Sequence, residues 1–229
     1  MCGRYTLTSP ADEIGAEFGV EVPADYQPHY NIAPTQPVPI IGLDAEGEQR
    51  LAFVRWGLVP YWAESPRDVK HTINARAESL LLKPAFREAF VNRRCLVIAD
   101  GFYEWQRVDG KRQPFRFHLK GDRLFAFAGI WERWKGKDGE PLYSCAIVTT
   151  AASPIVAPVH DRMPAILAPE LRNAWLDPKS DPVRLSDLLA PYAESDLEKY
   201  TVSARVNAVV NDSPDLIEPS DPVDGGQNK

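Results

Sequence analysis

The second residue, Cys2, has the most distinctive chemistry that this sequence offers, because it directly follows Met1. Its small side chain permits removal of an initiator methionine, which would leave an α-amine and a thiol on the same residue. With pKa values of about 8 and about 8.5, both groups would supply nucleophile at neutral pH. A 1,2-aminothiol can condense with an aldehyde, first to a Schiff base and then to a five-membered thiazolidine, or it can attack an acyl group. The alternative is that a cysteine at this position has no chemical role.

A second candidate is Glu104, which lies between aromatic residues in the segment Phe102-Tyr103-Glu104-Trp105. A carboxyl group in such surroundings should have a raised pKa, and a general acid or base that works near neutral pH requires this. The alternative is a solvent-facing acid on a strand of alternating pattern.

Two short segments combine a polar side chain with an arginine. His160 and Arg162 lie in a segment that Pro164 should keep extended, and they could together clamp a phosphate or a sugar. His160 could equally be an ordinary surface or core histidine. Asn74 and Arg76 place an amide donor and a guanidinium close together, but Asn74 could instead be the N-cap of a helix.

The charge distribution limits which partners the chain can bind. The net charge is −6, yet residues 50–133 hold 16 basic against 9 acidic side chains. A polyanion could therefore bind only in a local basic groove. Trp56, Trp62 and Trp105 accompany this segment, and exposed aromatic rings beside arginines suit single-stranded nucleic acid. Simple packing of these rings is the alternative.

Several other chemistries are excluded by absent motifs. The sequence has no Cys-x-x-Cys, no His-Glu-x-x-His, no glycine-rich phosphate loop and no Gly-x-Ser-x-Gly. Its three cysteines and four histidines lack ligand spacing, so we expect no metal and no cofactor. Cys95 and Cys145 lie in apolar runs and should be buried, inert thiols. Without a secretory signal or a membrane-length apolar run, we expect a cytoplasmic protein.

These residues need a scaffold, and the residue patterns predict a largely antiparallel sheet with short helices, of the α+β class. Helices are expected over Ala11–Phe18 (capped at Ser9-Pro10), Ala75–Leu82, Pro84–Val91, Pro169–Leu176 and Val183–Leu189. Strands are expected over Leu51–Leu58, Cys95–Ala99, Phe102–Val108, Pro114–Leu119, Leu124–Trp131, Leu142–Thr150 and Tyr200–Val210. The Asp-Gly pairs at Asp109-Gly110 and Asp138-Gly139 predict hairpin turns.

Taken in order, seven segments resemble the SOS-response-associated peptidase (SRAP) family of abasic-site-crosslinking proteins. They are Met1-Cys2-Gly3-Arg4, Tyr30–Thr35, Trp56–Pro60, Asn74–Glu78, Ala99–Trp105, His160–Pro164 and, near the end, Val206-Asn207 with Asn211–Ile217. The resemblance runs from Cys2 to about Pro219. It implies a single domain over residues 1–219 built around a barrel-like β-sheet, and residues 220–229 are expected to be a disordered tail.

The resemblance also implies an activity, which is covalent capture of abasic sites in single-stranded DNA without a cofactor. It implies that Cys2 forms the thiazolidine, that Asn74 positions the amine and sugar, that Glu104 shuttles protons and that His160 assists ring opening. The implied DNA-binding residues are Arg4, Asn31, Trp62, Arg76, Trp105 and Arg162. We expect a monomer that associates with the nucleoid when it is bound to damaged DNA. An N-terminal-nucleophile peptidase or amidase, an additional lyase or autopeptidase activity, and a non-covalent single-strand binder remain alternatives.

Overall fold

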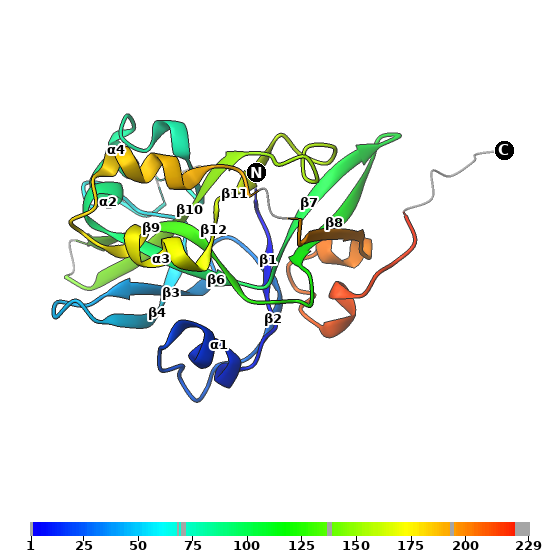
Figure 1. Cartoon of the computed structure of the whole chain (residues 1–229), viewed down its shortest axis with the longest axis horizontal. Helices are drawn as coiled ribbons and strands as arrows, with labels where there is room; N and C mark the ends of the chain where they lie inside the picture. The colour runs from blue at the N-terminus through cyan, green and yellow to red at the C-terminus, as the bar shows by residue number, and fades with distance from the viewer. Residues whose placement is uncertain (1, 68, 70–71, 137–138, 193–194, 223–229) are drawn as a thin grey trace.

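The computed structural model describes residues 2–67, 69, 72–136, 139–192 and 195–222, and Figure 1 shows the course of the chain. The strands are β1 (Tyr5–Leu7), β2 (His29–Ile32), β3 (Pro37–Leu43), β4 (Gln49–Trp56), β5 (Asn74–Arg76), β6 (Arg94–Ala99), β7 (Gly101–Val108), β8 (Lys111–Leu119), β9 (Phe125–Lys135), β10 (Pro141–Ala151), β11 (Arg162–Pro164), β12 (Ile166–Leu167) and β13 (Leu197–Thr201). The α-helices are α1 (Ala11–Phe18), α2 (Pro84–Asn92), α3 (Pro169–Leu176) and α4 (Pro182–Leu185), and the 3₁₀ helices are η1 (Ala77–Ser79), η2 (Ser186–Leu189), η3 (Ala204–Asn207) and η4 (Pro214–Ile217).

Two sheets make up the molecule. In the larger one the order β10-β4-β3-β6-β9 closes on itself because β9 also pairs with β10, which makes a five-strand barrel. The smaller sheet has the order β13-β8-β7-β1-β2 and is antiparallel throughout. Among the strands that the structure describes, β4 and β5 each pair in parallel with β10, and the other strand pairs are antiparallel. The expected α+β class and the barrel-like, largely antiparallel sheet are confirmed.

The barrel interior is an apolar core. Every residue of β6 is buried, and the rings of Trp56 and Phe127 both make edge contacts with Tyr5, at centroid distances of 5.4 and 5.9 Å. A smaller cluster of Tyr103, Val202, Val206 and Leu216 attaches the segment after β13 to the second sheet. Burial of apolar side chains on this scale supplies most of the driving force for folding. β1 lies between the barrel and the β7–β8 hairpin, as Figure 1 shows.

Asp100 joins the two sheets at the point where the chain passes from β6 to β7. Its buried carboxylate accepts hydrogen bonds from the Thr6 hydroxyl at 2.6 Å, from the backbone and hydroxyl of Thr8, and from the Ser9 nitrogen at 3.0 Å. The Arg116 guanidinium lies 3.6 Å from the same carboxylate. These bonds hold the amino-terminal strand in register with β7, where Tyr5 pairs with Phe102.

Most expected elements are present, and α1 illustrates why. Asp12 and Glu13 lie in its first turn, Ile14 and Phe18 are buried, and Gly19 ends it in the left-handed conformation (φ 66°). The cap differs from the expectation: Pro10 itself occupies the N-cap position, and Ser9 bonds to Asp100 and not to the helix.

Two expected elements are wrong. The helix expected over Ala75–Leu82 is instead β5 followed by the single turn η1, because Asn74, Ala75 and Arg76 pair with β10. The strand expected over Tyr200–Val210 ends at Thr201, and Val206 then packs into the smaller cluster.

The two Asp-Gly turns have different outcomes. The Asp109-Gly110 turn is confirmed, with φ values of 49° and 79° and Val108 paired to Lys111. The second Asp-Gly pair falls partly, and the expected tail mostly, outside the described residues. Within the described residues, no helix is both long and apolar enough to span a membrane.

Candidate functional site

Cys2 is buried in the segment that precedes β1. Its thiol lies 3.6 Å from the Arg4 carbonyl oxygen, and its own carbonyl oxygen accepts a hydrogen bond of 2.7 Å from Asn74 Nδ2. Burial, and secondly the negative charge of Glu104, raise the pKa of the Cys2 thiol well above its usual range. In this arrangement the thiol is therefore less ionised at neutral pH than the sequence alone would lead us to expect.

Glu104 lies on β7, where it pairs across the strands with Phe115 of β8, and its side chain is only 3% exposed. Burial raises the pKa of its carboxyl group, while the nearby His160 lowers it in part. The predicted raised pKa is confirmed, and the solvent-facing alternative is wrong. Because the same carboxylate affects the pKa of the Cys2 thiol, the two side chains interact electrostatically.

Asn74 reaches Cys2 from the barrel. It lies on β5 beside Ile147 of β10, and no helix begins at it, so the N-cap alternative is wrong. Its Nδ2 binds the Cys2 carbonyl, whereas its buried Oδ1 accepts no hydrogen bond from the described residues. A buried acceptor of this kind is costly unless a donor arrives. Asn74 Oδ1 is therefore ready to accept a hydrogen bond from an amine or a hydroxyl.

His160 is the second-last residue of the 152–161 loop, which connects β10 to β11. Its Nδ1 accepts a hydrogen bond of 3.0 Å from the Arg162 backbone nitrogen and lies 2.9 Å from the Asp161 carboxylate. With its side chain 28% exposed, the imidazole borders solvent, and it interacts electrostatically with the buried Glu104.

The three arginines expected to bind DNA, Arg4, Arg76 and Arg162, differ in how much of the guanidinium is already bonded to protein. Arg4 donates to Asn31 Oδ1 at 3.0 Å and to the Val206 carbonyl at 2.7 Å. Arg162 makes a two-pronged ion pair with Glu78, at 2.6 and 2.9 Å. Arg76 is exposed. Of the three, Arg76 presents the most accessible guanidinium to an anion.

The remaining candidates divide into one exposed and two structural side chains. Trp62 is 55% exposed, whereas Trp105 is half-buried and its Nε1 donates to Asn207 Oδ1 at 2.7 Å. Asn31 is buried, and its Nδ2 donates to the carbonyls of Val206, Ala208 and Asn211. In this structure Asn31 holds the segment that supports Arg4. Trp56, also considered for stacking, is buried in the barrel.

Comparison with known proteins decides the family. Residues 1–209 match the family "SOS response associated peptidase (SRAP)". This chain belongs to the SRAP family.

Relatives and solved structures extend this result. "Abasic site processing protein YoqW" of Bacillus subtilis (strain 168) is 47% identical over 95% of this chain and 99% of its own length. "Abasic site processing protein HMCES" of Gallus gallus is 35% identical over 85% of this chain and 67% of its own length. A crystal structure of a Bacteroides thetaiotaomicron protein has a TM-score of 0.86 and 25% identity, covering 96% of this chain and 100% of that one. The resemblance inferred from the motifs is confirmed.

Sequence reasoning about this SRAP protein missed two residues that shape the site. Asp100 was visible only as part of a motif, although an acid directly after a fully apolar strand is a signal for a buried hydrogen-bond acceptor. Thr149 on β10 pairs with Arg76, and its hydroxyl is buried without a hydrogen-bond partner in the described residues. No local pattern distinguishes Thr149 from its neighbours.

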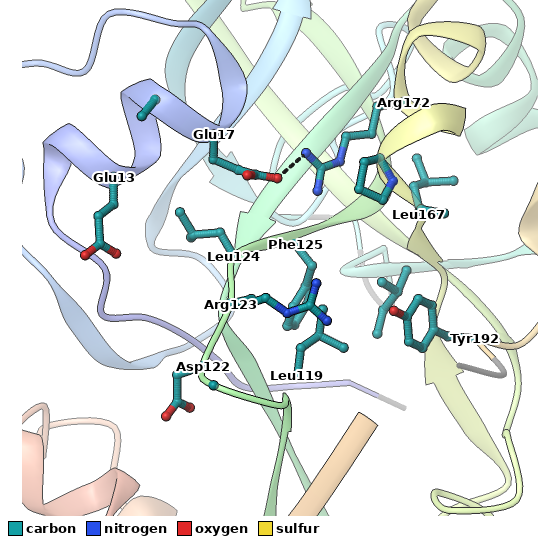
Figure 2. A pocket seen from close by; sticks show the side chains of 15 residues that line it. Glu13, Glu17, Leu119, Asp122, Arg123, Leu124, Phe125, Leu167, Arg172 and Tyr192 are labelled. Carbon is teal, nitrogen blue, oxygen red and sulfur yellow. Dashed lines mark hydrogen bonds and ion pairs between the residues drawn. The ribbon is translucent and has the colours of Figure 1, made fainter. Parts of the chain in front are cut away.

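A separate cavity of about 480 Å³ lies between α1, the β8–β9 turn and α3. Figure 2 shows its charged lining, in which Arg172 donates to Glu17 at 2.7 Å. The Arg172 guanidinium also lies 4.6 Å from the ring centre of Phe18. None of the SRAP site residues described above lines this cavity.

In the described part of the chain, no group of three or more His, Cys, Asp or Glu side chains is placed to hold a metal ion.

Proposed function

We propose that this protein binds abasic sites in single-stranded DNA and captures them covalently through Cys2, which shields the damaged strand. The observation that carries the proposal is the meeting of Cys2, Asn74 and Glu104, from three separate strand regions, in one buried site. The names of the relatives, abasic site processing proteins, support the same substrate.

The first step uses the α-amine that removal of Met1 would expose. The amine attacks C1′ of the open-chain sugar aldehyde to form a carbinolamine, which then loses water to give an imine. Asn74 is placed to orient this step, because its Nδ2 fixes the Cys2 carbonyl and its Oδ1 can accept from the amine. Holding amine and aldehyde together supplies several kcal/mol of the barrier as effective molarity, on the order of the values for intramolecular reactions.

The second step closes the ring. Glu104, whose pKa is raised by burial, donates a proton as the hydroxyl of the carbinolamine leaves as water. The neutral Cys2 thiol then adds across the imine: sulfur bonds to C1′ and the thiol proton passes to nitrogen through the Glu104 carboxylate. One water is released overall. The thiazolidine removes the imine, from which β-elimination would otherwise cleave the strand.

Strand binding is proposed to use the exposed Arg76 and Trp62, with Arg4, Asn31, Trp105 and Arg162 supporting the site. A phosphate could bind the Arg162 guanidinium only by displacing the Glu78 carboxylate from it. We further propose a monomer with one domain over residues 1–219, which works in the cytoplasm on nucleoid DNA.

The Trp62→Ala variant tests the stacking role. Loss of one base–ring contact should weaken binding of an abasic single strand by roughly tenfold, within the range of about 1–3 kcal/mol per stacked base. The rate of crosslinking at saturating DNA should stay the same. Titration by fluorescence anisotropy measures the affinity, and Tyr143→Ala, which removes another exposed ring on β10, is the matched control. Equal loss in both variants would contradict a specific role for Trp62.

The proposed function is tested by the intact mass of the protein before and after incubation with an abasic oligonucleotide. The first mass should lack Met1, and the second should equal protein plus DNA minus one water, with the adduct on Cys2. A protein that binds the abasic strand but gains no mass would be a non-covalent binder. Cleaved DNA without an adduct would indicate a lyase, and an acyl adduct from a peptide would indicate a peptidase.

A further inference from the structure

The position of His160 depends on a loop with little regular structure. Within the 152–161 loop the backbone makes short turns, including bonds from Val156 to Ser153 and from His160 to Val156, and the Ala152 nitrogen donates to the Asp161 carbonyl across the base of the loop. The Val156 side chain is fully buried, which anchors the middle of the loop. Such local turns leave the loop's distance from the second sheet to be set by other contacts.

Two side chains from the second sheet provide those contacts. Gln106 of β7 donates from Nε2 to the Pro158 carbonyl at 2.9 Å. Lys199 of β13 donates from Nζ to the Ile155 carbonyl at 3.1 Å, and its ammonium lies 5.4 Å from the ring centre of Phe115. The loop of one sheet is therefore tied to the other sheet at two carbonyls.

Of the two contacts, that of Gln106 lies closer along the chain to the candidate residues Glu104 and His160. Gln106 follows Glu104 by two residues on the same strand, so both side chains project from the same face of β7. The carbonyl that Gln106 binds belongs to Pro158, two residues before His160. β7 thus carries Glu104 directly and, through the Gln106 hydrogen bond, contacts the loop that carries His160.

We propose that Gln106 is a positioning residue that sets the placement of His160, the residue expected to assist opening of the sugar ring, against Glu104, with Lys199 as the second anchor of the loop. The inference rests on the proposed function, because it concerns the rate of DNA capture. A displacement of about 1 Å in a reacting group can reduce a rate strongly, and one hydrogen bond of this kind can prevent it.

The test compares Gln106→Met, which keeps the length of the side chain but removes the donor, with wild type. The rate of crosslink formation at saturating abasic oligonucleotide should fall by about threefold to tenfold, the range expected for one lost hydrogen bond. The dissociation constant of the protein for an undamaged single strand, which has no abasic site to crosslink, should not change. Gln106→Lys, which restores an N–H donor, should recover most of the rate. The matched control is Gln49→Met, which removes a bond to Asn173 on the barrel side.

A double-mutant cycle separates positioning from general support. In a His160→Ala background, Gln106→Met should cause no further loss of rate, because the group that it positions is already absent. Full additivity of the two losses, or a wild-type rate in Gln106→Met, would overturn the proposal. Both outcomes require that wild type forms the crosslink, so a failure of the proposed function would be recognised first, in the wild-type control.

Discussion

Replacing Cys2 with alanine is expected to abolish the stable DNA adduct. The variant keeps the α-amine that Met1 removal exposes, so it can still form the imine with the sugar aldehyde, but no sulfur is present to close the ring. An imine hydrolyses readily and permits β-elimination, so cleaved DNA should accumulate in place of the adduct. Denaturing gel electrophoresis of the protein with an abasic oligonucleotide measures both products.

Two controls make this result specific. Sodium borohydride reduces an imine to a stable amine, so it should trap Cys2→Ala on DNA while leaving the wild-type yield unchanged. Cys145→Ala removes an equally buried thiol from β10 and should crosslink like wild type. A heat-stable adduct of Cys2→Ala at wild-type yield, formed without borohydride, would exclude the thiazolidine.

The parts of the fold that the sequence predicted are those with local determinants. Ala11–Phe18 contains its own acidic first turn and is followed by a left-handed glycine, and Asp109-Gly110 carries the two positive φ angles that a two-residue hairpin needs. The apolar run at Cys95–Ala99 likewise becomes a strand buried on both faces. Here the residues determine the conformation with little help from distant contacts.

The parts that were not predicted depend on distant partners. Ala75–Leu82 has an amphipathic, helix-like pattern, but Asn74–Arg76 forms a strand because β10, some seventy residues later, pairs with it in parallel. For the site, residue types predicted the raised pKa of Glu104 correctly. They could not show that burial raises the pKa of the Cys2 thiol, because the groups that surround it come from β5 and β7.

Replacing Glu104 with glutamine is expected to slow both formation and reversal of the crosslink by about a hundredfold, the lower range for loss of a general acid or base. Glutamine has the same shape, but it can neither donate a proton to the leaving water nor accept one from the thiol. Single-turnover kinetics with an abasic oligonucleotide measures formation, and transfer of the DNA to excess competitor protein measures reversal. Glu132→Gln is the matched control, since Glu132 on β9 is also 3% exposed but binds Arg93.

The pH dependence distinguishes proton transfer from a loss of packing. Because burial raises the pKa of Glu104, its acid form persists to a higher pH than that of an exposed glutamate, and the wild-type rate of water loss should fall as pH rises through that pKa. Glu104→Gln should lack this fall. The substitution also removes the negative charge that helps to raise the pKa of the Cys2 thiol, so alkylation of Cys2 should become faster in the variant. A Glu104→Gln rate that is reduced but follows the wild-type pH profile would assign the loss to packing and remove Glu104 from the proton transfers.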